Sequence, residues 1–156
     1  MKIAEYLKEK MGKDIIDLFS SIYPDWAIQD IKRMAYDENQ QLHVTTKVAI
    51  IDDKIVGQAN IFRLINNPTV ANLGYHVHPD YRRRGIGVVL ASAVIDKAKE
   101  YGIKILVIQT EIINQAAIKL AKKLGFDKPP KAFIKENVDG LKLYKLNNGI
   151  CLYKLI

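Results

Sequence analysis

The residues best suited to chemistry lie near the middle of the chain, where arginines meet glycines. Arg82–Arg84 are followed directly by Gly85-Ile86-Gly87. An apolar run, Val70–Val77, precedes them, and apolar residues at helical spacing begin at Val88. The first turn of a helix has backbone N–H groups without internal partners, and the helix dipole adds positive partial charge there. The stretch therefore predicts a strand, a turn and a helix whose start binds an anion, most naturally a phosphate.

Two familiar glycine-rich turns do not fit this stretch. A P-loop ends in Gly-Lys-Ser/Thr, whereas Val88 and Val89 follow Gly87 here. A dinucleotide-binding turn needs a third small residue where this chain has Leu90, and it lies near the start of its domain. Taken alone, Gly85 and Gly87 are equally compatible with a solvated arginine cluster on an ordinary turn.

Composition is that of a globular protein with one domain. The chain has 156 residues, of which 49% are hydrophobic and 26% charged. Its single cysteine, Cys151, rules out an internal disulfide or a multi-cysteine metal site, and we expect it to be a small apolar core residue. The N-terminus does not read as a signal peptide and no run is long enough to span a bilayer. We therefore expect a cytoplasmic protein that needs no metal and no membrane.

The net charge of +7 could indicate nucleic-acid binding. Against this, the basic residues are spread along the chain and no aromatic-plus-basic RNA motif is present. A polyanionic small ligand or simple solubility explains the charge as well. We therefore expect no nucleic-acid partner, and keep nucleic-acid binding as an alternative.

The N-terminal part predicts one short strand and two helices. Lys2–Leu7 alternates as a strand, and Lys13–Tyr23 has helical apolar spacing. Asp25 is expected to cap a second helix that runs to about Tyr36. The buried stripe expected for that helix is Trp26, Ile28, Ile31 and Met34, with polar residues 37–41 as a connector after it.

The middle part predicts three antiparallel strands. Leu42–Ile51 and Ile55–Ile65 form a hairpin around Asp52-Asp53-Lys54, and Gly57 indicates a bulge. Val70–Val77 is the third strand and leads into the arginine-glycine turn.

The C-terminal part predicts a parallel crossover and a last hairpin. The helix after the turn ends at Gly102, and Ile103–Ile108 should return parallel to the third strand. A further helix starts at Asn114, and 131–139 is either a short helix or a loop. Asn147-Asn148-Gly149 predicts a hairpin between 141–146 and 150–155. The fold class is α/β (α+β): one mixed, mostly antiparallel sheet with helices on both faces.

Three spaced motifs follow one another over residues 77–126 of the chain: Val77-x-Pro79-x-x-Arg82-x-x-Gly85-x-Gly87, then Asn114-x-x-Ala117-x-x-Leu120, then Leu124-Gly125-Phe126. Together they resemble the GCN5-related N-acetyltransferase (GNAT) superfamily. The resemblance covers about 70–126 and implies a single GNAT-like domain over residues 1–156. It also implies acetyl-CoA (coenzyme A) as co-substrate.

The resemblance further implies which positions bind that co-substrate. The N–H groups from Arg83 to Val88 would hold its pyrophosphate, and the edge of the third strand, which splays from its neighbour in the family, would pair with the pantetheine arm. Asn114 matches a family asparagine that helps to fix the pantetheine, although it could equally be a helix cap. The implied cofactor-binding residues are Tyr75, His76, Val77, Arg82, Arg83, Arg84, Gly85, Ile86, Gly87, Val88 and Asn114.

The catalytic positions depart from the family pattern. A frequent acid, tyrosine, is replaced by Ala121, and a frequent base, glutamate, by Gln109. Glu111 is the nearest carboxylate and is our candidate catalytic residue, with a surface or helix-terminus role as the alternative. His76, Tyr75, Tyr144 and relayed water are substitutes for the base. The Val77 N–H is the family candidate for stabilising the oxyanion.

The function that the resemblance implies is an acetyl-CoA-dependent N-acetyltransferase. A primary amine of a small molecule or a protein would attack the thioester directly. A non-catalytic acyl-CoA-binding module is the main alternative, because Ala121 and Gln109 cannot transfer protons in those roles. Dimers are frequent in the superfamily, so a homodimer is one expectation for the assembly.

Overall fold

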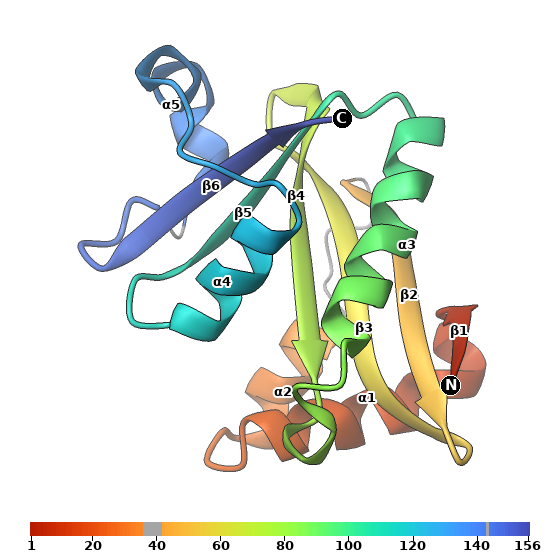
Figure 1. Ribbon diagram of the computed structural model, residues 1–156. Helices are drawn as coiled ribbons and strands as arrows, with labels where there is room; N and C mark the ends of the chain where they lie inside the picture. The colour runs from red at the N-terminus through yellow and green to blue at the C-terminus, as the bar shows by residue number, and fades with distance from the viewer. Residues whose placement is uncertain (36–41, 143) are drawn as a thin grey trace.

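The computed structural model describes residues 1–35, 42–142 and 144–156 of the chain. One six-stranded sheet runs through it, with strands in sequence order β1-β2-β3-β4-β5-β6 and helices on both faces (Figure 1). The strands are β1 (Lys2–Glu5), β2 (His43–Ile51), β3 (Lys54–Leu64), β4 (Asn67–Val77), β5 (Ile105–Glu111) and β6 (Gly149–Leu155). The helices are α1 (Lys8–Ile22), α2 (Ile28–Ala35), α3 (Ile86–Glu100), α4 (Gln115–Lys123) and α5 (Lys131–Asn137).

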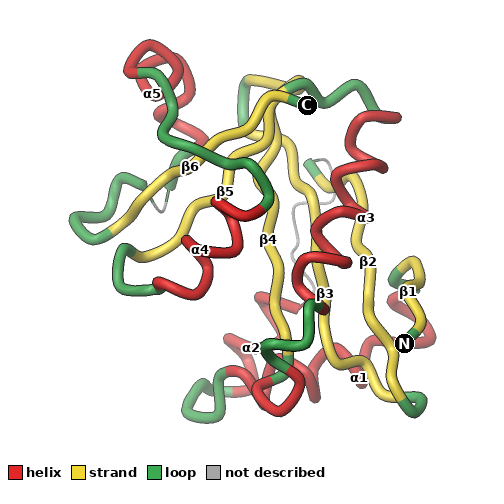
Figure 2. The backbone as a smooth tube through the Cα atoms, in the orientation of Figure 1, coloured by secondary structure: helices red, strands yellow, loops and turns green. Residues whose placement is uncertain are grey.

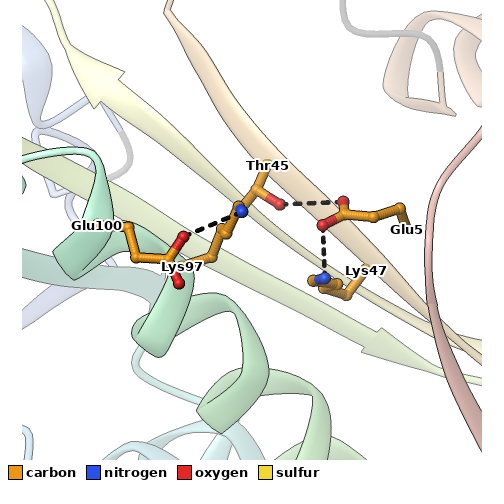
Figure 3. Close-up of polar contacts among 5 residues, drawn as sticks. All are labelled: Glu5, Thr45, Lys47, Lys97 and Glu100. Carbon is orange, nitrogen blue, oxygen red and sulfur yellow. Dashed lines mark hydrogen bonds and ion pairs between the residues drawn. The ribbon is translucent and has the colours of Figure 1, made fainter.

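Strands β1 to β4 form the expected antiparallel half of the sheet. Asp52 and Asp53 both have positive φ, as a two-residue hairpin turn that matches strand twist requires. The register between β2 and β3 slips between Ala49 and Ile50, which places the expected bulge beside Gly57. At the edge of the sheet, Glu5 of β1 accepts from Lys47 and Thr45 of β2 (Figure 3).

Strands β4 and β5 are parallel, as predicted, but they pair over only a short length. The register runs from Val70 opposite Ile105 to Asn72 opposite Val107 and then stops. Beyond it β5 turns away from β4, and β6 goes with it (Figure 1). Among the strands that the structure describes, the second half of β4 therefore has a neighbour on the β3 side alone. We call this divergence the β4–β5 split.

Alternation along β4 sends its side chains to two different layers. Leu73, Tyr75 and Val77 face α3 and α4, in a core cluster that includes Ile86, Leu90 and Phe126. His76 faces the other way, toward Phe19 of α1. Helices α1 and α2 pack on that second face through the buried side chains of Ile15, Leu18, Phe19 and Ile31. Helix α5 packs on the same face, where Phe133 contacts the cluster of Val70 and Cys151.

The hairpin predicted around Asn147-Asn148-Gly149 is wrong. The described residues of 141–148 form turns, not a strand, and β6 pairs antiparallel with β5 along its whole length. Strand β5 lies between β4 and β6, and its edge opposite β4 pairs with β6 from Ile105 to Glu111, which gives more hydrogen bonds than a local hairpin could. The Asn-Gly pair still makes a turn, but it turns the chain into an existing strand.

The N-terminal helices also differ from the prediction. Helix α1 starts at Lys8, not Lys13, and α2 starts at Ile28, so Asp25 does not cap it. Within the expected stripe Ile31 is buried, Met34 is half-buried, and Trp26 and Ile28 are 44% and 49% exposed. The connector 37–41 and Tyr36 lie outside the described residues.

Two open points are resolved by the structure. Residues 131–139 begin with a short helix, α5, so the helical alternative was right. Cys151 is 3% exposed and packs in the cluster under α5, as expected of a small core residue. Among the helices that the structure describes, none combines the length and the apolar character needed to cross a bilayer.

Candidate functional site

The turn between β4 and α3 has an unusual backbone because two of its residues adopt left-handed conformations. Arg83 has φ 63° and Gly85 has φ 80°. Gly85 precedes the first residue of α3, and a Cβ placed on it would meet no atom within 4 Å. Conformation rather than crowding therefore requires glycine at this position. The space above the turn is open.

The backbone donors of this turn are available for a ligand. Among the described residues, no acceptor bonds any backbone N–H from Arg83 to Val88, and the first internal bond of α3 runs from Val89 N to Gly85 O at 3.1 Å. These groups converge at the N-terminus of a 15-residue helix, where the helix dipole is positive. The arrangement fits a phosphate or diphosphate. Figure 2 shows the turn as the green loop at the end of β4.

Side chains around the turn hold it in this shape. Arg82 Nε donates to Val77 O at 3.1 Å, and Arg84 donates to Asp80 O at 3.2 Å while it covers the ring of Tyr81. A Cβ on Gly87 would lie 3.0 Å from Leu120 Cδ2, so the start of α3 packs closely against α4. Gly87 therefore serves helix packing as well as access to the backbone.

Within the described part of the chain, the edge of β4 beside the turn has backbone groups without a strand partner. His78 N donates to Val56 O on the β3 side, so by alternation the N–H groups of Tyr75 and Val77 point into the β4–β5 split. Pairing with β5 has already ended at Asn72. The structure thus has the free strand edge expected for Tyr75 to Val77.

Tyr75 bridges this split with its side chain. Its hydroxyl donates to Ala117 O of α4 at 2.8 Å, and burial raises the pKa of Tyr75 to about 12. Such a phenol holds its proton at neutral pH. Tyr75 therefore acts here as a structural donor between β4 and α4, and it is a poor substitute for a catalytic base.

Asn114 caps α4, as one of its two interpretations predicted. Its Oδ1 accepts from Ala117 N at 3.2 Å, and its Nδ2 donates to Thr110 Oγ1 at 3.2 Å. The side chain is thereby fixed at the mouth of the split. Its role toward the pantetheine stays a prediction.

His76 lies on the opposite face of the sheet, in aromatic surroundings. Its ring is 4.9 Å from that of Phe19 and 6.3 Å from that of Tyr23. Its Nδ1 is 3.3 Å from Gln58 Oε1, an acceptor, so Nδ1 carries the hydrogen and Nε2 has the free lone pair. Burial, helped by the charge of Arg82, lowers the pKa of His76 to about 4. The imidazole is therefore neutral at physiological pH.

Glu111 ends β5 with an exposed side chain. The parallel register pairs Asn72 of β4 with Val107 of β5. If this register continued for four more residues, Glu111 would lie opposite His76, with both side chains on the α1 face of the sheet. The split separates the two strands at this level. Glu111 therefore flanks the opening from the β5 side, and its catalytic role stays a prediction.

The two positions that depart from the family pattern have structural roles. Gln109 donates to Asn72 Oδ1 at 2.9 Å and accepts from Tyr144 N at 3.3 Å, which ties the turn region before β6 to the sheet. Ala121 is fully buried in the core cluster under α4. Neither side chain faces the split as a proton donor or acceptor.

Sequence reasoning missed an aromatic wall on the α1–α2 turn. The rings of Tyr23 and Trp26 stack at 4.2 Å, next to His76. Trp26 was assigned to a buried stripe because its spacing suited a helix. The signal that could have placed it on a loop was its position directly after Pro24-Asp25.

A cavity of about 190 Å³ lies on the same face, between α1, α2 and strands β2 and β3. Thr46, Gln58 and Asn60 contribute polar groups to its lining. Gln58 is also the hydrogen-bond partner of His76. The cavity and the end of β4 are therefore connected by one side chain.

Comparisons with known proteins agree with this geometry. A family model described as Acetyltransferase (GNAT) family matches residues 12–126. L-amino acid N-acyltransferase MnaT of Escherichia coli (strain K12) is 41% identical over 51 residues, which are 33% of this chain and 30% of that protein. The chain spans half or less of the length of the curated relatives that it matches.

Solved structures show the same fold at low sequence identity. Ribosomal-protein-alanine N-acetyltransferase from Brucella melitensis superposes with a TM-score of 0.74 at 18% identity, over 100% of both chains. The structure of yncA from Salmonella typhimurium with its cofactor acetyl-CoA superposes with a TM-score of 0.67 at 19% identity. It covers 83% of this chain and 81% of that one.

Proposed function

The chain belongs to the acetyltransferase (GNAT) family, and from this membership and its site we propose that it is an acetyl-CoA-dependent N-acetyltransferase. The family and the fold inferred from the motifs are thus confirmed. The acceptor that we propose is a primary amine on a small molecule or a protein. We expect the reaction to take place in the cytoplasm.

The observation that supports this proposal most directly is the set of available N–H groups from Arg83 to Val88. A diphosphate placed there would accept several hydrogen bonds at a positive helix end. The open space above Gly85 gives it room. Coenzyme A has such a diphosphate, so the residues present fit the co-substrate.

The β4–β5 split supports the next part of the proposal. The outward N–H groups of Tyr75 and Val77 suit the amides of a pantetheine arm, which would add to β4 as a short strand. Asn114 lies across the split on α4 and would contact the same arm. The thioester would then reach the second face of the sheet, beside His76 and Glu111.

The chemistry needs one donor and one proton acceptor. The acceptor nitrogen attacks the thioester carbonyl carbon, the C–N bond forms, and the C–S bond breaks to release the thiolate, which takes up a proton from water. We assign oxyanion stabilisation to the Val77 N–H. We assign removal of the amine proton to Glu111, directly or through water, because neither Gln109 nor Ala121 can do it.

The binding step is tested by removing a single N–H from the turn. Val88→Pro deletes one donor at a position without an internal partner, and Val88→Ala keeps that donor. Hydrogen bonds to charged groups contribute about 1.5–3 kcal/mol, so Val88→Pro should weaken coenzyme A binding about 10–100-fold in calorimetry. Val88→Ala should bind like the parent. Equal binding by both variants, each folded by circular dichroism, would contradict the phosphate assignment.

The catalytic step is tested by thiol release from acetyl-CoA with a broad panel of primary amines. Glu111→Gln should lower kcat by about 10²–10⁴-fold if Glu111 takes the proton. Glu136→Gln, which alters an exposed carboxylate of α5, is the matched control and should not change kcat. Tight coenzyme A binding without thiol release for any amine would favour the acyl-CoA-binding module over the enzyme.

A further inference from the structure

The side chain of Arg82 is fixed at one end and free at the other. Its Nε donates to Val77 O at 3.1 Å, at the tip of β4. Among the described residues, no acceptor is bonded to its two Nη groups, and no carboxylate forms an ion pair with it. The side chain is exposed. A guanidinium held in this way presents two parallel donors, the geometry that suits a carboxylate.

The charge of Arg82 acts on the α1 face of the sheet. Burial raises the pKa of Tyr23 and lowers that of His76, and the positive charge of Arg82 acts on both groups. The geometry agrees, because Arg82 Nε is bonded to the carbonyl of Val77, the residue next to His76, and the ring of Tyr23 lies 6.3 Å from that of His76. The backbone N–H groups from Arg83 to Val88 are instead available at the start of α3.

Three chemically different groups meet at this point. Arg82 has a positively charged guanidinium, and the neutral ring of His76 has a lone pair at Nε2. The stacked rings of Tyr23 and Trp26 form an apolar surface. Trp26 is 44% exposed, so this surface can be reached from solvent. Arg82 is bonded to the carbonyl of Val77, His76 is the neighbour of Val77 in β4, and the N–H of Val77 points into the split.

We propose that the acceptor is a free amino acid, or a similar amine with a carboxylate on the neighbouring carbon, and that Arg82 binds this carboxylate. The proposal rests on the proposed acetyltransferase function and names the substrate class of the same site. A carboxylate bound by the Arg82 guanidinium would place the neighbouring nitrogen beside the tip of β4, where it would be acetylated. The aromatic wall takes the side chain, and His76 Nε2 accepts a hydrogen bond from the nitrogen.

The same groups select against other amines. A polyamine would bring a second positive charge toward Arg82 without a partner for it. A protein N-terminus has an amide where the amino acid has its carboxylate, so it would lose the charge-assisted pair. Arg82 is therefore a specificity-determining residue for free amino acids.

The test compares acceptors that share one side chain. L-Phenylalanine, L-phenylalaninamide and phenethylamine differ in the group next to the amine, and their kcat/KM values are compared after correction for the fraction of free amine. We expect a preference for the carboxylate of about 10–100-fold, since hydrogen bonds to charged groups contribute about 1.5–3 kcal/mol. Equal values for the acid and the amide would overturn the proposal.

Variants then assign the preference to a residue. Arg82→Gln should remove the preference by raising the KM of L-phenylalanine, and Arg82→Lys should restore part of it. Arg83→Gln is the matched control, because it alters an arginine of the phosphate turn: it should change the KM of acetyl-CoA and leave the acceptor preference intact. A preference that survives in Arg82→Gln would also overturn the proposal.

A binding measurement separates this proposal from the proposed function. In calorimetry, N-acetyl-L-phenylalanine should bind more tightly than N-acetylphenethylamine, and Arg82→Gln should abolish the difference. If peptides or polyamines are acetylated and these amino acids are not, the carboxylate proposal is wrong and the acetyltransferase stands. If no amine releases thiol, the acetyltransferase function itself is wrong.

Discussion

Gln109 illustrates how a single residue can be committed to structure at a position where the family resemblance implied a catalytic base. Its amide donates to Asn72 Oδ1 and accepts from Tyr144 N, and its Nε2 is also 3.5 Å from Gly140 O. Only a group with both a donor and an acceptor can make these contacts. A carboxylate at this position would face acceptor oxygens.

Replacing Gln109 by glutamate is therefore expected to destabilise the fold without creating a base. Gln109→Glu puts a negative oxygen against Asn72 Oδ1 and should lower the free energy of unfolding by about 1–3 kcal/mol. Urea denaturation measures this loss. Gln109→Met, which keeps the length but not the polarity, is the comparison. A rise in kcat for Gln109→Glu would contradict the structural assignment.

His76 gives the protein a pH dependence of known sign. In the unfolded chain a histidine binds its proton near pH 6.5, whereas the pKa of the folded His76 is lowered to about 4 by burial and by Arg82. The stabilisation is complete above pH 6.5 and is lost as pH falls through 4. At about 1.36 kcal/mol per pKa unit, the loss is bounded at about 3 kcal/mol.

Chemical denaturation between pH 7 and pH 4 tests this dependence. His76→Phe keeps a ring in the same aromatic surroundings but cannot bind a proton. It should flatten the fall in unfolding free energy across this range relative to the parent. An unchanged slope would show that His76 is not the group responsible.

Among the elements, α3 depends on close packing against β3 as well as on its own capping. A Cβ on Gly57 would lie 2.8 Å from Leu90 Cδ1 and 3.2 Å from Ile86 Cγ2. Both partners belong to the first turns of α3, and Ile86 is its first residue. Gly57 therefore sets the distance between the sheet and the phosphate turn.

Enlarging Gly57 should affect stability and cofactor binding together. Gly57→Ala overpacks this contact and should cost about 1–3 kcal/mol of unfolding free energy. Because α3 must move, coenzyme A binding should weaken in parallel. The double variant Gly57→Ala with Leu90→Val should recover part of both losses. Additive losses in the double variant would argue against a shared contact.

At the scale of the whole molecule, the β4–β5 split connects the two faces of the sheet. The phosphate turn and α3 lie on one face, and the aromatic wall of α1 and α2 lies on the other (Figures 1 and 2). A thioester that enters from the first face would meet an amine bound on the second. Coenzyme A binding should therefore be reported by backbone groups of both β4 and α3.

Hydrogen exchange measures this coupling. The amides of Tyr75, Val77 and Arg83 to Val88 should exchange rapidly in the free protein and slowly with coenzyme A bound. At a concentration of about 100 times Kd, the ligand should also add about 2.7 kcal/mol to the free energy of unfolding. Protection confined to α3, with none in β4, would place the pantetheine elsewhere.

The sequence alone determined the elements whose signals are local. The apolar run ending at Val77, the glycine pair Gly85 and Gly87, and the Asn114 cap specify a strand, a turn and two helix starts, because each depends on neighbours within a few residues. Taken in order along the chain, these signals predicted the fold class, and they succeeded because turn and cap chemistry acts over short range. The splayed edge of β4 was implied by the family resemblance, and phosphate binding at the turn stays a prediction.

Tertiary structure decided what depends on partners distant in the chain. Asn147-Asn148-Gly149 has a strong hairpin signal, yet β6 pairs with β5, whose edge opposite β4 offers it a partner along its whole length. Trp26 has helical spacing, yet it lies exposed on a turn beside Tyr23. The side-chain position of Arg82, fixed by a carbonyl at the tip of β4, could not be read from its motif. Local patterns fix backbone conformation, whereas strand partners and side-chain environments are chosen by the packing of the whole chain.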